Sequence, residues 1–276
     1  MIDAHFHAWS LARGDYGWLT PALAPIYRDV HVSDWQALAQ AQDIQGGVLV
    51  QAAPTAAETQ FLLAQARLHA GVLGVVGWLD MLAPDAVAQV EQWARDPWLK
   101  GLRPMLQDLP DPDWILQPAI TPVLQAMARC GLVFDALITS VHLSRIATVI
   151  AQHPDLTVVI DHGAKPTMAP GVTADWARAM DALARTTDPA RVVCKLSGLW
   201  TQAEPDHDCD VVRPWCDSLL QSFGPHRLLW GSDWPVLELA GRYERWRAVS
   251  LDVLQHCTDA ERAAVLGGNA RRIYRL

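Results

Sequence analysis

Two histidines separated by one residue, His5 and His7, end the first apolar run of the chain. Side chains of a β-strand alternate between its two faces, so both imidazoles point the same way if this run is a strand. Such a pair can bind a divalent metal or donate hydrogen bonds to a carbonyl oxygen, and the alternative is that both histidines simply pack. We favour a functional pair.

Asp233 lies in the run LLWGSDWP, where Pro235 stops the strand that the apolar residues predict. A carboxylate at a strand end can orient or deprotonate a water molecule, whereas the alternative is an aspartate that caps a helix or fixes a loop. In a closed barrel the first and eighth strands are neighbours. We therefore expect Asp233 to lie beside His5 and His7.

Further polar residues end other apolar runs. His162 ends TVVIDH and would add a third imidazole, and Lys195 lies within VVCKLSGL. An inward-pointing Lys195 would need a carboxylate or an anionic substrate as its partner, because burying an unpaired charge is costly; the alternative is a side chain that extends to solvent. Arg103 precedes Pro104 and could hold a substrate oxygen through its several donors.

Gln51, Trp78 and Asp135 also lie at or near predicted strand ends, where each could either contact a substrate or simply pack. We include Gln51 and Trp78 among the expected substrate-binding residues.

These residues are positioned by short β-branched runs that alternate with longer stretches rich in alanine and leucine, a pattern typical of repeated βα units and a parallel sheet. The predicted strands are 2–5, 47–51, 72–79, 99–103, 132–136, 157–162, 192–196 and 228–233. The predicted helices are 33–42, 55–69, 84–95, 119–130, 143–153, 176–185 and 211–223. Eight strands with intervening helices predict an α/β fold, a single-domain (β/α)8 TIM-type barrel over residues 1–276. Residues 108–113 and 202–210 are the expected long loops.

Composition excludes several classes of protein. The 276 residues are 51% hydrophobic and 19% charged, which predicts a globular chain with a full core. The formal net charge of −8, without a basic stripe, argues against a nucleic-acid partner. Neither a GxGxxG nor a GxxxxGK[ST] motif supports a nucleotide cofactor, and the five cysteines have no CxxC spacing. With no long apolar run and no leader-like start, we expect a cytoplasmic protein without a membrane partner.

Eight motifs, in order along the whole chain, resemble the amidohydrolase superfamily, and within it the amidohydrolase-2 branch of sugar-acid lactonases, such as those acting on L-fucono- and L-rhamnonolactones. The motifs are DAHFHAW at 3–9, LVQAAPTAAET at 49–59, GVVGWLD at 74–80, GLRPMLQD at 101–108, IDHGAKP at 160–166, KLSGL at 195–199, WGSDWPV at 230–236 and GNARRIY at 268–274.

The resemblance implies a distorted (β/α)8 barrel whose site uses the two first-strand histidines, His162 and Asp233, with Arg103 and Lys195 contacting the substrate. Binuclear relatives carry a carboxylated lysine or a glutamate at the end of the fourth strand, where this chain has Arg103. The resemblance therefore implies either no required metal or one divalent ion, zinc being favoured, held by His5, His7 and Asp233.

These inferences lead to one functional hypothesis: hydrolysis of a small-molecule sugar-acid lactone in carbohydrate metabolism. Asp233 would take a proton from water, while His5, His7 and His162 would polarise the carbonyl and stabilise the oxyanion. The alternatives are a lactone isomerase or a decarboxylase of the same superfamily, and a sugar-acid binding protein without catalysis.

Overall fold

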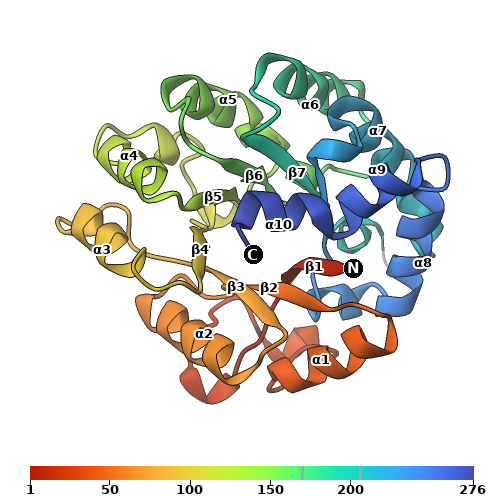
Figure 1. The fold of residues 1–276 in the computed structure, drawn as a ribbon, viewed down its shortest axis with the longest axis horizontal. Coiled ribbons are helices and arrows are strands. Elements are labelled where there is room, and N and C mark those ends of the chain that lie inside the picture. Colours follow the sequence, from red (N-terminus) through yellow and green to blue (C-terminus); the bar gives the residue numbers. More distant parts are fainter. Residues whose placement is uncertain (169–170, 205–206) are drawn as a thin grey trace.

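The computed structural model describes residues 1–168, 171–204 and 207–276. Its centre is one sheet of eight parallel strands, in which strands consecutive in the sequence are neighbours in the sheet (Figure 1). The strands are β1 (Ile2–Phe6), β2 (Gly46–Val50), β3 (Val72–Gly77), β4 (Leu99–Leu102), β5 (Val133–Ala136), β6 (Val158–Ile160), β7 (Val192–Leu196) and β8 (Leu228–Trp230). Register irregularities between β1 and β4 distort the sheet, and the predicted distorted (β/α)8 barrel is confirmed.

Helices surround the barrel (Figure 1). They are α1 (Val32–Ala41), α2 (Ala56–Leu68), α3 (Ala86–Trp93), α4 (Thr121–Cys130), α5 (Leu143–Gln152), α6 (Ala174–Thr186), α7 (Arg213–Phe223), α8 (Tyr243–Val253), α9 (Asp259–Ala263) and α10 (Asn269–Tyr274). Each predicted helix is present, with its ends within two residues of the prediction. The sequence patterns did not predict α8, α9 or α10.

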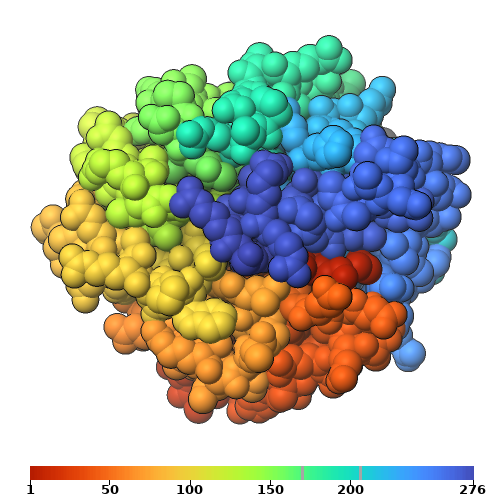
Figure 2. All heavy atoms as spheres, in the orientation of Figure 1, coloured from red at the N-terminus to blue at the C-terminus, as the bar shows by residue number. Residues whose placement is uncertain are grey.

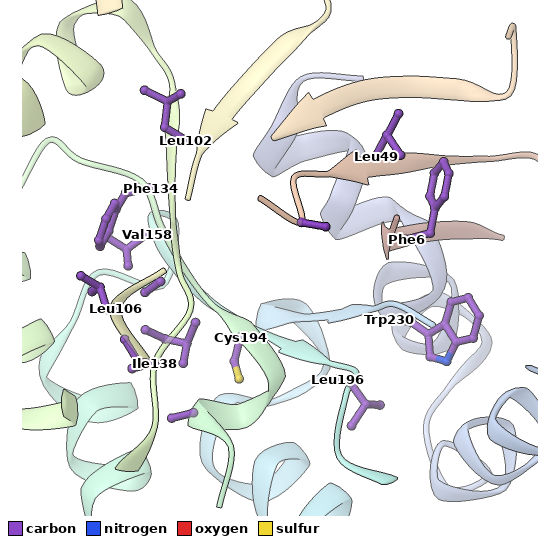
Figure 3. Close-up of a cluster of buried hydrophobic side chains, with 14 of the residues drawn as sticks. Phe6, Leu49, Leu102, Leu106, Phe134, Ile138, Val158, Cys194, Leu196 and Trp230 are labelled. Carbon is purple, nitrogen blue, oxygen red and sulfur yellow. The ribbon is translucent and has the colours of Figure 1, made fainter. Parts of the chain in front are cut away.

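Side chains of the strands alternate between two apolar layers, as the period of two requires. Outward-pointing residues pack between strands and helices, and Figure 3 shows part of this core, with Leu49, Phe134 and Trp230 among the labelled residues. Inward-pointing residues fill the barrel with mostly branched side chains, namely Val48, Val50, Val76, Val133, Val159, Val193 and Leu229. A filled interior leaves the two ends of the barrel as the places where a site can form.

The barrel closes between β1 and the segment after β8 through a bridge that pairs Phe6 with Trp234. Two backbone hydrogen bonds accompany this bridge: Asp233 N donates to His5 O at 2.8 Å, and His7 N donates to Trp234 O at 2.7 Å. The closure therefore falls on the residues that the sequence singled out.

The C-terminal helix α10 covers the opposite end of the barrel. Its side chains Ala270, Ile273 and Tyr274 pack against the inward-pointing strand residues. Figures 1 and 2 show this end, where the C-terminal segment lies across the middle of the molecule beside the N-terminus.

Some predicted boundaries were wrong near the site. β8 ends at Trp230 and β6 at Ile160, so Asp233 and His162 lie in turns and not within strands. Of the expected loop 202–210, residues 205–206 lie outside the described part of the chain, and residues 209–212 form a short 3₁₀ helix. Residues 106–108 likewise form a 3₁₀ turn at the start of the other expected loop.

Candidate active site

Asp233 is the centre of a cluster of imidazoles. Its Oδ1 lies 3.3 Å from His7 Nε2, 3.6 Å from His5 Nε2 and 3.8 Å from His162 Nε2. All four side chains are almost completely buried. The structure thus brings together the four residues that the sequence predicted as catalytic.

The hydrogen bonds of His7 and His5 indicate where their protons lie. His7 Nδ1 lies 2.8 Å from the Val50 carbonyl oxygen, which only accepts, so Nδ1 carries a proton, while Nε2 lies 3.3 Å from Asp233 Oδ1. His5 Nδ1 lies 3.0 Å from Lys195 Nζ, which only donates, so Nδ1 accepts and Nε2 of the neutral ring carries the proton. The two Nε2 atoms are 3.2 Å apart, so the protonated Nε2 of His5 faces Nε2 of His7.

A buried ion-pair network lies beneath His5. Lys195 Nζ contacts Asp135 Oδ2 at 2.6 Å and Asp161 Oδ1 at 2.9 Å, and Arg103 Nη1 donates to Asp161 Oδ2 at 3.3 Å. Tyr274 of α10 donates to Asp135 Oδ2 at 2.7 Å. Burial raises the pKa of the Asp161 carboxyl, but Lys195 and His5 outweigh this effect and hold the pKa well below its usual value. The network therefore contains two cations and two carboxylates.

A second buried network joins the two strands that carry the site. The Asp3 carboxylate accepts hydrogen bonds from the Ser232 backbone and hydroxyl at 2.8 and 2.6 Å, from Tyr243 at 2.9 Å and from Trp35 at 3.0 Å. Asp3 thereby fixes β1 against the turn that ends in Asp233.

His162 lies in a left-handed turn. Residues 162–165 have φ values of 53°, 58°, 59° and 42°, and only the second of them is a glycine. Left-handed backbone costs roughly 1–2 kcal/mol for each residue other than glycine. The turn is held by Lys165 N donating to His162 O at 2.9 Å and by Trp176 Nε1 donating to Gly163 O at 2.8 Å. Such concentrated strain is typical of functional sites.

Burial and neighbouring charges set the protonation of the cluster. Burial raises the pKa of the Asp233 carboxyl, but His162, His7 and His5 lower it by a larger amount. The pKa of Asp233 therefore lies well below its usual value. Burial lowers the pKa of His162 to about 4. Burial, followed by the charge of Lys195, also holds the pKa of His5 well below its usual value. At neutral pH the site therefore contains an ionised Asp233 beside neutral His5 and His162.

A cavity of about 260 Å³ opens above this cluster. The catalytic candidates at its base are His7, His162 and Asp233, with Arg103 and Lys165 beside them. The remaining lining residues are Trp18, Leu23, Ala52, Met105, Gln107, Asp108, Leu137, Thr201, Gln202, Val236 and Leu239. The cavity therefore combines hydroxyl-binding polar groups with an apolar wall.

Some predicted residues lie elsewhere. His5, Lys195 and Gln51 are fully buried and are not among the described residues that line the cavity. Gln51 Nε2 instead donates to the backbone carbonyl of Arg103 at 2.7 Å. Trp78 lines a neighbouring, mostly apolar cavity of about 430 Å³, which shares Trp18, Met105 and Asp108 with the first.

Two charged residues next to His162 were missed as site residues, as were the polar rim residues Gln107, Thr201 and Gln202. Asp161 and Lys165 belong to the motif IDHGAKP, but a strand through His162 would have pointed Asp161 away from the site. The sequence does show an acidic and a basic residue close to His162, but the directions of their side chains follow only from the left-handed turn.

The donor atoms fit one metal ion better than two. Ligand atoms of His5, His7 and Asp233 lie within 4.8 Å of one another, and so do those of His5, Asp161 and His162. The two groups share His5, and Asp161 is already paired with Lys195 and Arg103. His5 Nε2 could ligate only if its proton moved to Nδ1, which now accepts from Lys195. Arg103 Nη1, 3.4 Å from His5 Nε2, adds a repelling charge. The residues therefore fit a single, weakly held divalent ion.

Comparison with known proteins identifies the family of this chain. A family model described as Amidohydrolase matches residues 2–276. The chain belongs to this amidohydrolase family.

Among its relatives, L-fucono-1,5-lactonase from Burkholderia ambifaria is 43% identical over 280 residues, covering 100% of this chain and 95% of that protein. A protein of the same name from Burkholderia multivorans is 34% identical, with 100% and 96% covered. The crystal structure of a Burkholderia multivorans amidohydrolase with bound zinc is 33% identical, covers 100% of this chain and 99% of its own, and superposes with a TM-score of 0.92.

Among the described residues, no helix of this amidohydrolase has both the length and the hydropathy that crossing a bilayer requires.

Proposed function

We propose that this amidohydrolase opens a sugar-acid lactone by hydrolysis, with L-fucono-1,5-lactone as the first substrate to test. The observation that carries the proposal is the convergence of His7 and His162 on an ionised Asp233 at the base of a cavity. The relatives named L-fucono-1,5-lactonase support the choice of substrate.

In the proposed reaction, Asp233 accepts a proton from a water molecule while the water oxygen attacks the lactone carbonyl carbon. The ring C–O bond of the tetrahedral intermediate then breaks, and the departing ring oxygen takes the proton from Asp233. The open-chain acid loses its own proton to solvent. His7 orients Asp233 toward the attacking water, because its Nε2 lies 3.3 Å from Asp233 Oδ1 at the cavity.

His162 is the imidazole that suits the carbonyl oxygen. Its Nδ1 lies 2.9 Å from the buried Ser197 hydroxyl, and donation from that hydroxyl leaves the proton on Nε2, which faces the cavity. His5 is fully buried and contacts both Asp233 and His7, so it keeps these two side chains in place. This division of roles refines the expectation that all three histidines polarise the carbonyl, since His7 directs Nδ1 to the Val50 carbonyl and Nε2 to Asp233, and His5 is not among the described residues that line the cavity.

His7, Asp233 and His5 would hold a single divalent ion, with zinc favoured, which when bound would lower the pKa of a coordinated water. The polar rim of the cavity would bind the hydroxyl groups of the substrate, through Gln107, Thr201 and Gln202.

The test is an assay of the purified protein on a panel of aldonolactones, with the product analysed by NMR. We expect an open-chain hydroxy acid, and Asp233→Asn should keep the fold but lower kcat by at least about 100-fold, as is typical when a general base is lost. An isomeric lactone, a decarboxylated product or an Asp233→Asn variant with nearly unchanged turnover would contradict the proposal.

A further inference from the structure

Lysine is rare in this chain, which contains only Lys100, Lys165 and Lys195. Lys100 lies at the end of the barrel away from the site, where its Nζ donates to the Arg275 carbonyl at 3.1 Å. Lys195 is locked between Asp135 and Asp161. The Lys165 side chain lines the cavity and has no hydrogen-bond or ion-pair partner among the described residues.

The left-handed turn explains why Lys165 faces the cavity. In a 3₁₀-type turn, residues three apart lie on the same side. His162 and Lys165 are three apart, and both line the cavity beside Asp233. The strained backbone thus presents an imidazole and an ammonium group to the same space.

Lys165 differs from the other cations near the cavity in how its charge is balanced. Lys195 and Arg103 are balanced by Asp135 and Asp161 in the network below. His162 is neutral at pH 7 because burial lowers its pKa to about 4. The unbalanced charges at the base of the cavity are then the Asp233 carboxylate and the Lys165 ammonium, with Asp108 more exposed at the rim.

Burial lowers the pKa of Lys165, while Asp233 acts in the opposite direction. Lys165 and Asp233 line the same cavity.

We propose that Lys165 is a further catalytic residue, which binds the lactone carbonyl oxygen and stabilises the negative charge that develops on it. The proposal rests on the proposed lactonase function. When Asp233 takes the proton of water, its negative charge is lost and an equal charge develops on the former carbonyl oxygen. A cation near both positions favours this transfer of charge, because it is attracted more strongly to the transition state than to the neutral carbonyl.

The test compares steady-state kinetics of the wild type, Lys165→Met, Lys165→Arg and the matched control Lys100→Met on L-fucono-1,5-lactone. We expect Lys165→Met to lower kcat by at least about 100-fold, the effect typical of losing an oxyanion donor. Lys165→Arg should retain more of the rate because it keeps the charge, and Lys100→Met should match the wild type.

Chemical rescue provides a second measurement. In Lys165→Ala, added ethylamine should raise kcat in proportion to its concentration, whereas ethanol should not. Circular dichroism of each variant checks the fold, and if Lys165→Met does not fold, rescue of Lys165→Ala decides.

A Lys165→Met variant that keeps the wild-type kcat, or that changes only KM, would overturn the assignment, as would absence of amine rescue in a folded Lys165→Ala protein. Lack of lactonase activity in the wild type would instead refute the proposed function itself.

Discussion

The position of one proton on His5 decides how well the site can hold a metal ion. Lys195 donates to His5 Nδ1 and so keeps the proton on Nε2, the atom that would have to face the ion. The charge of Arg103 nearby opposes a divalent cation further. Catalytic zinc sites have three protein ligands with supporting hydrogen bonds, whereas here one of the three is in the wrong tautomer.

We therefore predict that the purified protein contains less than one metal ion per chain and keeps most of its lactonase activity after treatment with EDTA. The measurements are the metal content by elemental analysis and the lactonase activity, each before and after dialysis against EDTA. Two ions per chain, or complete loss of activity that added Zn2+ restores, would show that the tautomer argument is wrong.

Single residues were predictable where a strand end fixed their direction. His5, His7 and Asp233 converge as expected, because closure of the barrel makes β1 and β8 neighbours. Asp161 and Lys165 were not predicted as site residues, because a period of two does not apply in a left-handed turn. The sequence predicted that an inward-pointing Lys195 needs a carboxylate or an anionic substrate as its partner. In the structure two carboxylates, Asp135 and Asp161, contact it.

At the scale of elements, the turn after β7 supports the turn after β6. Gly198 has φ +58°, and a Cβ added to it would lie 2.3 Å from His162 Nδ1. The loop after β7 must therefore have a glycine here for His162 to keep its hydrogen bond to Ser197.

Gly198→Ala should displace His162 and lower kcat by at least about 10-fold, since displacing a catalytic group by about 1 Å can lower the rate by more than that. Gly224→Ala is the matched control, because Gly224 also has a positive φ, +70°, but no atom lies within 4 Å of its added Cβ. The control should lose some stability from backbone strain and keep its kcat. Equal kcat values in the two variants would contradict the role of Gly198. Kinetics and thermal unfolding measure both effects.

A buried carboxylate joins the loop after β1 to the start of α2. Glu58 accepts hydrogen bonds from Tyr16 at 2.6 Å and from the Ala52 backbone at 3.1 Å, and Ala52 lines the cavity. Burial raises the pKa of Glu58 from 4.5 to about 7 despite these donors. The folded state therefore binds the proton more tightly than the unfolded state does.

Because the folded-state pKa is raised, ionisation of Glu58 should lower the free energy of unfolding as pH rises from 4.5 to 7, by on the order of 3 kcal/mol. The measurement is the difference in unfolding free energy between the wild type and Glu58→Gln, followed by urea denaturation from pH 4.5 to 8. Glu91→Gln, at an exposed ion pair, is the control and should give a constant difference. A constant difference for Glu58→Gln as well would refute the raised pKa.

Most elements were predictable because their hydrophobic periods agree with the barrel that they form. The exceptions lie where tertiary contacts overrule the local pattern. Residues 228–233 were predicted as one strand, yet β8 stops at Trp230, because the backbone and hydroxyl of Ser232 donate hydrogen bonds to Asp3. The helix α10 is short and rich in arginine, so its pattern alone did not indicate a buried helix.

For the whole molecule, the two ends of the barrel have different tasks. One end carries the cavity and the strained turn, and the C-terminal segment with α10 covers the other (Figure 2). Ile273 and Tyr274 of α10 pack against the inward-pointing strand residues. Tyr274 also reaches Asp135 and so connects this cover to the ion pairs beneath His5. We expect the cover to stabilise the entire barrel, because its side chains belong to the cluster that the inward-pointing strand residues form.

Ile273→Ala should therefore lower the free energy of unfolding by about 2–5 kcal/mol, the usual cost of such a truncation in a core. The kcat of the folded protein should stay near the wild-type value, since the cavity lies at the other end. Leu68→Ala, at a side chain that is 75% exposed at the end of α2, is the matched control and should change stability by less than about 0.5 kcal/mol. Urea denaturation followed by fluorescence and by activity measures both. If Ile273→Ala were as stable as the control, α10 would be a loosely attached segment; if it lost kcat along with stability, the two ends of the barrel would be coupled through Tyr274 and Asp135.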